Sequence, residues 1–397
     1  MNLRLNHFLI AVLLAVITSA TLSGCSSEPT LTESPTSVPT SAPLPTSPSA
    51  PPAATAEPTA TAEPSPTAIP TVTPEPTATP IPTPTAIPYP AVSGIVDVSN
   101  TSWPRDIETS DGLVRLEEPP QRILSYSLGH DEILLALVNK GRFAAVGPFT
   151  GNPAYSNVSD FVADMPIYEK GVENVLAADP DLVIVSKYTD ADIVSLIKEA
   201  GVPVVRPALE NSAEGNIPNI LLMGYMLGVE DRALELVAEI EYRLSLVKDR
   251  VPPAGSSDRP VVIAVTRYSD SMYVAGEGTT ESGIIKTAGG VNAGERDGLS
   301  GHQKVSVESI AAMDPEVILI TQPVDFGAGE LHDDLLAHPA LASVRAVMDS
   351  AVMIVDSRKY TTLSHWNVRG IEETAFLLYP DKFADIEFAD FEPYTGE

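Results

Sequence analysis

VENVLAADPDLVIVS (residues 172–186) recurs as VESIAAMDPEVILIT (residues 307–321). The two stretches align without a gap at an offset of 135 residues, with identities at Val, Glu, Ala, Asp and Pro. Each is predicted to form a short helix that ends at an Asp-Pro step, because the residue before a proline is pushed out of the helical region. An apolar run follows in both copies, as in a strand that is buried on both faces of a sheet. The repeat therefore predicts two lobes that share one helix-strand unit.

Apolar strands and helices alternate on both sides of the first copy, and this order is typical of an α/β fold with parallel strands. Gly201 stops the helix that precedes the fourth strand. The predicted strands are residues 122–127, 143–147, 181–186, 202–205 and 261–266, and the predicted helices are residues 130–138, 172–178 and 192–200.

Residues 217–251 separate the lobes, and only Pro218 and Gly228 interrupt their helical composition. Apolar residues recur there at spacings of three and four, which predicts one long amphipathic helix. Twenty residues of helix span about 30 Å, enough to bridge two lobes. The predicted domains are an N-terminal lobe (91–210), a connecting helix (211–252) and a C-terminal lobe (253–397).

The N-terminus predicts export and lipid attachment. Residues 1–24 contain Arg4 and then an apolar run over residues 8–17, which is too short to span a bilayer, and so they are expected to form a signal peptide. The signal ends in Leu-Ser-Gly-Cys25, which resembles a bacterial lipobox, so Cys25 is expected to carry the lipid. Cys25 is the only cysteine, which excludes an intrachain disulfide.

Residues 25–90 are predicted to form an extended stalk, because 19 of the 37 prolines lie between residues 28 and 90 among Thr, Ser and Ala. Beyond the stalk, residues 91–397 contain 23 basic and 48 acidic residues, a net charge of −25. Such a surface repels phosphate backbones and anionic lipid headgroups. The sequence therefore argues against a nucleic-acid partner and leaves the lipid as the membrane attachment.

Four motifs in order resemble one family, the helical-backbone class of ABC-importer binding proteins for siderophores, haem and cobalamin. They are RILSYSLGHDEILLAL (122–137), the first repeat copy, AGGVN (288–292) with the second copy, and LLYP (377–380). The resemblance implies two Rossmann-like lobes joined by a long rigid helix, as in class III periplasmic binding proteins. It further implies a monomer without intrinsic cofactor or catalysis, held by its lipid at the outer face of the cytoplasmic membrane, in the periplasm or at the cell surface.

The resemblance also implies a cargo and partners: a ferric siderophore, or alternatively haem or cobalamin, delivered to a permease with its ATPase. In this family one glutamate on each lobe docks onto arginines of the permease, and the matching residues are Glu173 and Glu308. Each is predicted to lie in the first turn of its helix. There a carboxylate is also favoured by about 0.3 to 1 kcal/mol through the helix dipole alone.

Ligands of such bilobal proteins bind between the lobes, at loops that follow the carboxyl ends of the strands. His302 and Tyr360 are candidate metal ligands, because some siderophore-binding relatives complete iron coordination with a His and a Tyr of the second lobe. The full set of candidate ligand-binding residues is His130, Tyr188, Arg267, Tyr268, His302, Tyr360, His365 and Trp366.

Three other functions remain open at this stage. A receptor for bare zinc, manganese or iron would need several His and carboxylates converging on one cation. A glycosidase would need two carboxylates across one short gap, whereas the two repeat glutamates are expected on separate lobes. An adhesin would explain the stalk but not the duplicated lobes.

Overall fold

The computed structural model describes residues 88–169 and 171–396, all within one compact unit, Pro82–Glu397. The signal peptide, Cys25 and nearly all of the predicted stalk lie outside the described residues. Tyr89 already belongs to the folded unit, since its hydroxyl donates to the Leu221 carbonyl at 2.6 Å. Among the described helices, none combines the length and the apolar character that crossing a membrane requires.

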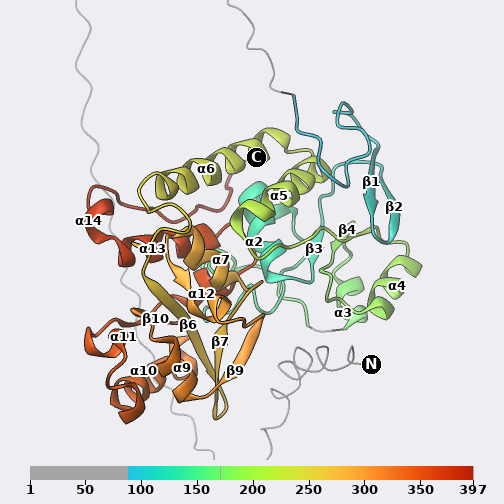
Figure 1. Cartoon of the computed structure of the whole chain (residues 1–397). Coiled ribbons are helices and arrows are strands. Elements are labelled where there is room, and N and C mark those ends of the chain that lie inside the picture. The colour runs from blue at the N-terminus through green and yellow to red at the C-terminus, as the bar shows by residue number, and fades with distance from the viewer. Residues whose placement is uncertain (1–87, 170, 397) are drawn as a thin grey trace, which may run out of the picture. The chain divides into compact units, whose positions relative to one another are not determined.

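The N-terminal lobe has a three-stranded parallel sheet in the order β3-β4-β5, of which Figure 1 labels β3 and β4. The side chains of β3 and β4 are completely buried, which agrees with their mainly apolar sequences, Ile-Leu-Ser and Leu-Val-Ile. The elements of this sheet layer are β3 (Ile123–Ser125), α2 (Leu128–Leu137), η1 (Lys140–Arg142), α3 (Val172–Ala177), β4 (Leu182–Ile184), α4 (Ala191–Glu199) and β5 (Val204–Val205).

Two local features of this lobe differ from the sequence prediction. The strand predicted over residues 143–147 is not formed, because Phe143 bridges to Ile123 whereas Val146 bridges to Ile167, so no ladder of consecutive pairs develops. An antiparallel hairpin of β1 (Arg105–Thr109) and β2 (Gly112–Leu116) precedes the sheet and was not predicted.

The C-terminal lobe has a six-stranded mixed sheet in the order β11-β10-β6-β7-β9, with β8 also paired to β6. β6, β8, β10 and β11 are parallel, and β7 is antiparallel to both of its neighbours. The strands are β6 (Val261–Tyr268), β7 (Ser271–Ala275), β8 (Val291–Asn292), β9 (His302–Val305), β10 (Val317–Ile320) and β11 (Val352–Ile354). The helices are α7 (Thr280–Thr287), α8 (Ala293–Arg296), α9 (Val307–Met313), η2 (Val324–Phe326), α10 (Ala328–Ala337), η3 (Pro339–Leu341), α11 (Arg345–Met348), α12 (Ser357–Thr361), α13 (Asn367–Leu378) and α14 (Pro380–Phe383).

The repeated sequence forms the same local structure in both lobes, α3-β4 in the first and α9-β10 in the second. The aspartates of the two Asp-Pro steps, Asp179 and Asp314, have φ of 53° and 43°. This left-handed conformation is uncommon for residues other than glycine, although aspartate tolerates it. Matching backbone geometry at matching positions supports a common helix-turn-strand unit, and the predicted helix ends are confirmed.

The connecting segment corrects the prediction of one helix over residues 217–251. It forms two helices, α5 (Ala213–Leu227) and α6 (Glu230–Lys248), which pack against each other. Gly228 separates them with φ of 69°, and the Val229 N–H closes the turn on the Gly224 carbonyl at 2.9 Å. A glycine in the left-handed conformation ends a helix readily because it has no Cβ. The 19 residues of α6 are about 28 Å long.

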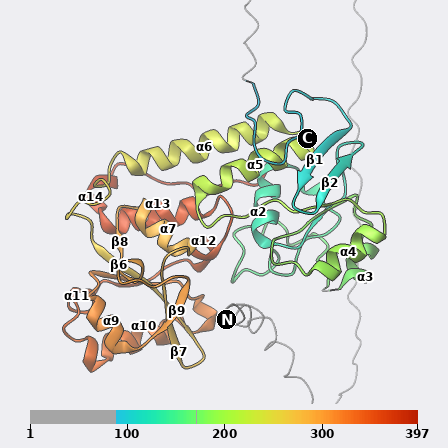
Figure 2. The same ribbon diagram turned by 45° about the vertical axis from the view of Figure 1, so that its right-hand side comes forward.

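α6 connects the lobes along one side of the unit, packing against α2 of the first lobe and α13 of the second (Figure 2). The end of the chain then returns from the C-terminal lobe to the N-terminal lobe. Residues after α14 return to the N-terminal lobe, where the Tyr394 N–H donates to the Leu135 carbonyl at 2.7 Å and Asn139 Nδ2 donates to the Gly396 carbonyl at 3.2 Å. The last residues of the predicted C-terminal lobe therefore pack on the first lobe.

Candidate functional site

A pocket of about 360 Å³ lies between the lobes. The N-terminal lobe contributes Pro153 and Ala154, and the C-terminal lobe contributes residues 323–325 after β10 and residues 354–358 at and after the end of β11. Both C-terminal segments follow the carboxyl ends of parallel strands, where ligands of open α/β sheets bind. The pocket therefore lies where the sequence predicted a ligand cleft.

Aromatic rings from opposite lobes meet beside this pocket. The ring of Tyr155, next to Ala154, lies 5.7 Å from the ring of Phe326, next to Asp325. Phe149 contacts Tyr155 edge-on at 5.5 Å. Phe149 and Phe326 remain 41% and 54% exposed, so much of their apolar surface is free to contact a ligand.

The charged residues of the pocket partly neutralise each other. Arg358 holds Asp356 through two hydrogen bonds, Nε to Oδ1 at 2.8 Å and Nη2 to Oδ2 at 2.7 Å. Burial acts to raise the pKa of Asp356, but the hydrogen bonds and charge of Arg358 more than offset it, so the pKa lies below its ordinary value. The guanidinium is thus already paired with a carboxylate.

The side chain of Glu132 connects the two lobes close to the lining residue Arg358. This completely buried carboxylate in α2 accepts hydrogen bonds from Thr362 Oγ1 at 2.6 Å and Ser364 Oγ at 2.5 Å in the C-terminal lobe. It also accepts from the N–H and Nδ2 of Asn157, whose Nδ2 reaches the Arg358 carbonyl at 3.1 Å. Burial raises the pKa of Glu132, although these hydrogen bonds oppose the shift. The contacts fix how the two lobes approach each other.

Four of the predicted ligand residues reach the surface, although the structure does not gather them around the pocket. Tyr188 and Tyr268 are 63% and 41% exposed, and Arg267 forms an ion pair with Asp334. His302 Nε2 lies 3.0 Å from Glu281 Oε1, and this hydrogen bond raises the pKa of His302. As loop and strand-end residues they stay candidate ligand contacts.

The other four predicted residues are buried, which corrects their assignment to the cleft surface. Tyr360 is completely enclosed and hydrogen-bonds Thr374 Oγ1 at 2.8 Å, whereas the rings of His365 and Trp366 contact Phe391. His130 is also fully buried in α2. A position after a strand tells which end of the sheet a residue occupies, but packing decides whether its side chain points into the core. Tyr360 is therefore not available as a metal ligand beside His302.

A metal site built from the protein alone is not found in the described chain. Over residues 88–169 and 171–396 there is no group of three or more His, Cys, Asp or Glu placed to hold a metal ion. Arg358 instead lines the pocket, Tyr155 and Phe326 lie beside it, and Glu132 joins the lobes; the sequence analysis missed all four. The acidic pair Asp131-Glu132 inside an apolar helix was a usable signal, because unpaired carboxylates are rarely buried.

The buried imidazole of His365 predicts a pH effect on stability. Burial, together with the nearby charges of Arg243 and Arg232, lowers the pKa of His365 to about 3. Below about pH 6.5 the unfolded chain binds a proton at this residue that the folded chain excludes, so its contribution to stability is lost as the pH falls. Relative to His365→Phe, the wild type should lose about 1 kcal/mol of unfolding free energy per pH unit between pH 6 and pH 4.

Denaturant unfolding at several pH values measures this difference. The exposed His338 offers a control, since His338→Phe removes an imidazole that lies outside the core. A difference between His365→Phe and wild type that stays constant across the pH range would contradict the assignment.

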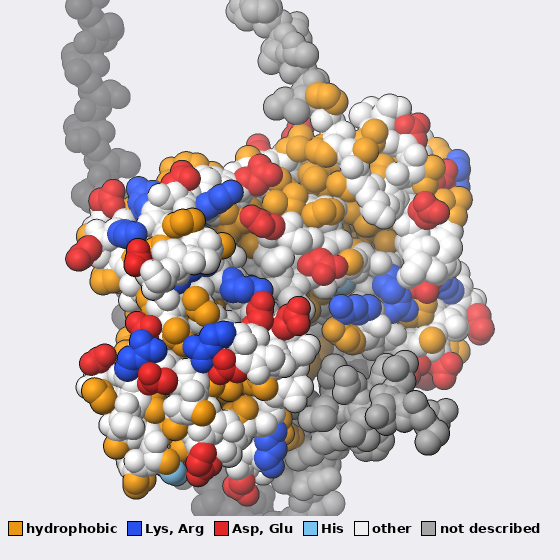
Figure 3. Space-filling view, in the orientation of Figure 1, with side chains coloured by type: hydrophobic (Ala, Val, Ile, Leu, Met, Phe, Trp, Pro, Cys, Tyr) orange, Lys and Arg blue, Asp and Glu red, His pale blue; other side chains and the backbone are white. Residues whose placement is uncertain are grey.

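Glu173 and Glu308 occupy equivalent exposed positions in the first turns of α3 and α9. Hydrogen bonds from its own backbone N–H and from Ser306 lower the pKa of Glu308, which therefore stays ionised. Figures 1 and 2 show α3 and α9 on the side of the unit away from α6, one helix on each lobe. On the face drawn in Figure 3, acidic side chains are spread over the surface, and basic side chains lie among them, several of them grouped on the right-hand side.

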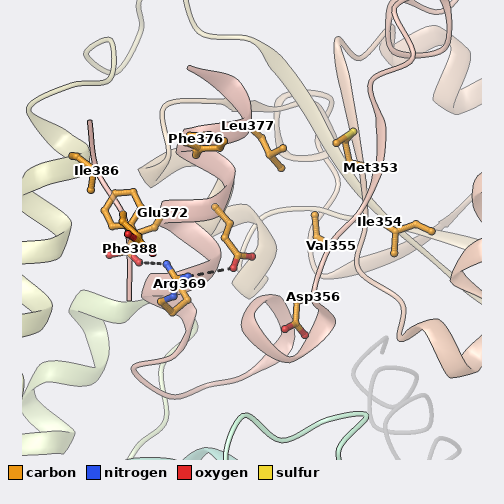
Figure 4. Close-up of a pocket in the computed structure, with 12 residues that line it drawn as sticks. Met353, Ile354, Val355, Asp356, Arg369, Glu372, Phe376, Leu377, Ile386 and Phe388 are labelled. Carbon is orange, nitrogen blue, oxygen red and sulfur yellow. Dashed lines mark hydrogen bonds and ion pairs between the residues drawn. The ribbon is translucent and has the colours of Figure 1, made fainter. Parts of the chain in front are cut away.

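A second cavity of about 430 Å³ lies between β11, α13 and residues 386–388 (Figure 4). It shares Ile354, Val355 and Asp356 with the pocket between the lobes. Its charged walls are paired: Arg369 binds Glu372 at 2.6 Å and Asp390 at 2.8 Å. The Asp390 contact joins α13 to the C-terminal segment, residues 384–396 after α14. This favours a structural role for the residues around the second cavity.

Comparison with known proteins identifies relatives over most of the folded unit. The family model described as periplasmic binding protein matches residues 123–358. The uncharacterized ABC transporter substrate-binding lipoprotein YvrC of Bacillus subtilis is 24% identical over 281 residues, which cover 70% of this chain and 86% of the relative. The ferric enterobactin-binding periplasmic protein FepB of Escherichia coli is 26% identical over 299 residues, with 68% and 89% covered. A cobalamin-binding protein of Halobacterium salinarum is 26% identical over 214 residues, with 53% and 57% covered.

Solved structures share the fold. The periplasmic heme-binding protein RhuT of Roseiflexus sp. RS-1 superposes with a TM-score of 0.57 at 23% identity, covering 66% of this chain and 99% of that chain. The periplasmic heme-binding protein HutB of Vibrio cholerae gives a TM-score of 0.58 at 20% identity with the same coverage. At these identities the superpositions show the fold alone, and they confirm the predicted class III architecture.

Proposed function

This chain belongs to the periplasmic binding protein family, and from that premise we propose that it captures a ferric siderophore and delivers it to an ABC importer. The chain is a substrate-binding component of the importer type and not an enzyme. Its named relatives bind ferric enterobactin, Fe(3+)-citrate or cobalamin, and structural neighbours bind heme. Cobalamin and haem are therefore the alternative cargoes.

The position of the pocket is the observation that carries this proposal. It lies between two lobes, at the carboxyl ends of β10 and β11, and it is lined by segments from both lobes. Its volume of about 360 Å³ falls within the range of about 300 to 1,000 Å³ for small-molecule sites. A ligand bound there would touch both lobes at once.

The test is a binding titration of the purified full-length chain in detergent. Isothermal calorimetry with a ferric hydroxamate, a ferric catecholate, haem and cobalamin should give micromolar or tighter binding for at least one complex, with the ligand recovered chemically unchanged. Failure of all four to bind, by a chain whose circular dichroism shows it folded, would remove the proposal.

Delivery requires contact with a membrane permease, and we propose Glu173 and Glu308 as the two docking residues. They are exposed, acidic and on different lobes, which suits a partner that presents two basic sites. Helix physics accounts for an acidic first-turn residue on either lobe alone. The same residue at the same repeat position on both lobes is what favours a shared partner.

The remaining parts of the proposal concern location and assembly. Cys25 is proposed to carry the lipid that holds a monomer at the outer face of the cytoplasmic membrane, and YvrC is itself named a lipoprotein. Mass spectrometry of the intact chain would decide the matter, because an unmodified Cys25 in the mature protein would contradict lipid attachment.

A further inference from the structure

We infer that the cargo is a metal complex of low net charge, fully coordinated by its own chelator, whose outer surface Tyr155 and Phe326 recognise by ring contacts. The inference rests on the proposed function, since it specifies which metal complex the pocket between the lobes accepts. Three features support it: the rings beside the pocket, the charges that line it, and the absence of a converging set of metal ligands among its described lining residues.

The rings provide an apolar contact surface that spans both lobes. Tyr155 and Phe326 approach each other at 5.7 Å with their planes inclined by 34°, and Phe149 extends the group on the N-terminal lobe. Val324 lines the pocket beside them and is 70% exposed. Exposed apolar side chains grouped at a pocket are typical of a binding surface. Such rings make favourable contacts with aromatic or hydrocarbon groups of a ligand.

The charges of the pocket disfavour a strongly anionic ligand. Arg358 is its only basic lining residue, and both nitrogen atoms of the guanidinium that face Asp356 are bound to that carboxylate. Asp325 lines the same pocket and takes part in no ion pair within the described residues. Recognition of a polyanionic chelate usually relies on Arg or Lys groups that are free to pair with it. The acidic excess of residues 91–397 adds a repulsive field.

The pocket also lacks a set of protein ligands for a bare metal ion: the only carboxylates among its described lining residues are Asp325 and Asp356, and Asp356 is bound to Arg358. None of its lining residues is a histidine or a tyrosine, and His130, His365 and Tyr360 are enclosed in the core. Tyr155 follows the lining residue Ala154 and carries the phenol nearest to the pocket along the chain. Burial raises the pKa of this phenol, which favours its neutral form over a phenolate that could bind a metal. This lining suits a metal whose coordination sphere is already filled by its chelator.

The experiment compares probes that differ in charge and coordination. Full-length protein in detergent is titrated with a neutral ferric trihydroxamate, a trianionic ferric tris-catecholate, cobalamin, haem and Fe³⁺ alone. We expect the neutral trihydroxamate or cobalamin to bind at least about tenfold more tightly than the tris-catecholate, a difference of about 1.4 kcal/mol. Fe³⁺ alone should not bind, and the absorption spectrum of a bound complex should match that of the free complex.

Variants of the two rings test the recognition itself. Phe326→Ala and Tyr155→Ala should each weaken binding of the preferred probe by about tenfold or more, whereas Tyr155→Phe should bind like the wild type because only the ring is used. Tyr242→Ala is the matched control, since Tyr242 is an aromatic residue on α6 with 63% exposure. Thermal unfolding of each variant shows whether its fold is retained.

Two outcomes separate this inference from the proposed function. Preference for the tris-catecholate, a spectral change that reports protein coordination, or unchanged affinity in folded Phe326→Ala and Tyr155→Ala would overturn the inference and leave an importer binding protein in place. Absence of binding to every metal complex would overturn the proposed function and the inference with it.

Discussion

Reversing both docking charges, with Glu173→Arg and Glu308→Arg together, is expected to abolish ligand uptake while ligand affinity changes by less than about twofold. Both residues are exposed at helix first turns and neither lines the pocket. Placing like charges across an interface costs several kcal/mol. A loss of about 2 kcal/mol at each lobe would lower affinity for the importer about a thousandfold. Uptake of radiolabelled iron complex by cells and calorimetry on the purified chain measure the two effects.

The control must also reverse first-turn charges without touching the proposed interface. Glu214 and Asp231 are exposed acidic residues in the first turns of α5 and α6, and α6 lies on the other side of the unit from α3 and α9. Glu214→Arg with Asp231→Arg should change stability by a similar amount, about 0.3 to 1 kcal/mol per helix, and leave uptake intact. Each single reversal at the docking positions should reduce uptake partially. Normal uptake by the double docking variant would eliminate the docking assignment.

The substitution Glu372→Ala is expected to destabilise the folded unit by about 3 to 5 kcal/mol, because it removes one partner of a buried ion network. The Glu372 side chain is completely buried. Its carboxylate binds Arg243 Nε and Nη2, both at 2.7 Å, and Arg369 Nη1 at 2.6 Å. Arg243 belongs to α6, and its Nη2 also donates to the Ala389 carbonyl at 2.7 Å. The network therefore joins the connecting helix, α13 and the C-terminal segment.

Thermal and denaturant unfolding measure this loss, which corresponds to a decrease in Tm of about 10 °C for a unit of this size. Glu241→Ala, at an exposed glutamate on the same helix α6, should stay within about 0.5 kcal/mol of the wild type. Pairing Glu372→Met with Arg243→Met should destabilise less than Glu372→Met alone, because the Arg243 guanidinium is then not left without its carboxylate, while Arg369 keeps its hydrogen bond to Asp390. A loss below 1 kcal/mol for Glu372→Ala would show that the network does not hold these elements together.

The repeat made the lobes predictable from sequence. Its helix-strand unit depends on local rules, namely the Asp-Pro helix stop and the buried apolar run, and both copies formed as predicted at α3-β4 and α9-β10. The prediction of one continuous connecting helix was wrong at Gly228, where the local sequence signals conflicted. The helical composition of the flanking residues favoured continuity, whereas the glycine adopted the left-handed conformation that lets α5 fold back on α6.

The sequence analysis predicted where the candidate site lies in the fold, but not which residues form it. The sequence placed a cleft at the carboxyl ends of the strands, and the pocket lies there. Histidine and tyrosine were favoured as ligands for their chemistry, yet His130, Tyr360 and His365 are core residues. Tyr155 and Phe326 were missed because the contact joins residues 171 positions apart, from loops without a recognisable motif.

Sequence alone determined the features that depend on neighbours along the chain: the duplicated helix-strand units, the α/β order, the acidic surface and the family resemblance that the comparisons confirmed. Tertiary structure alone decided which side chains are buried, which arginines are neutralised and which rings face each other across the lobes. The physical reason is that helix ends and strand periodicity are set by local sterics and backbone hydrogen bonds. Burial and charge pairing are instead set by distant segments, whose approach no local pattern encodes.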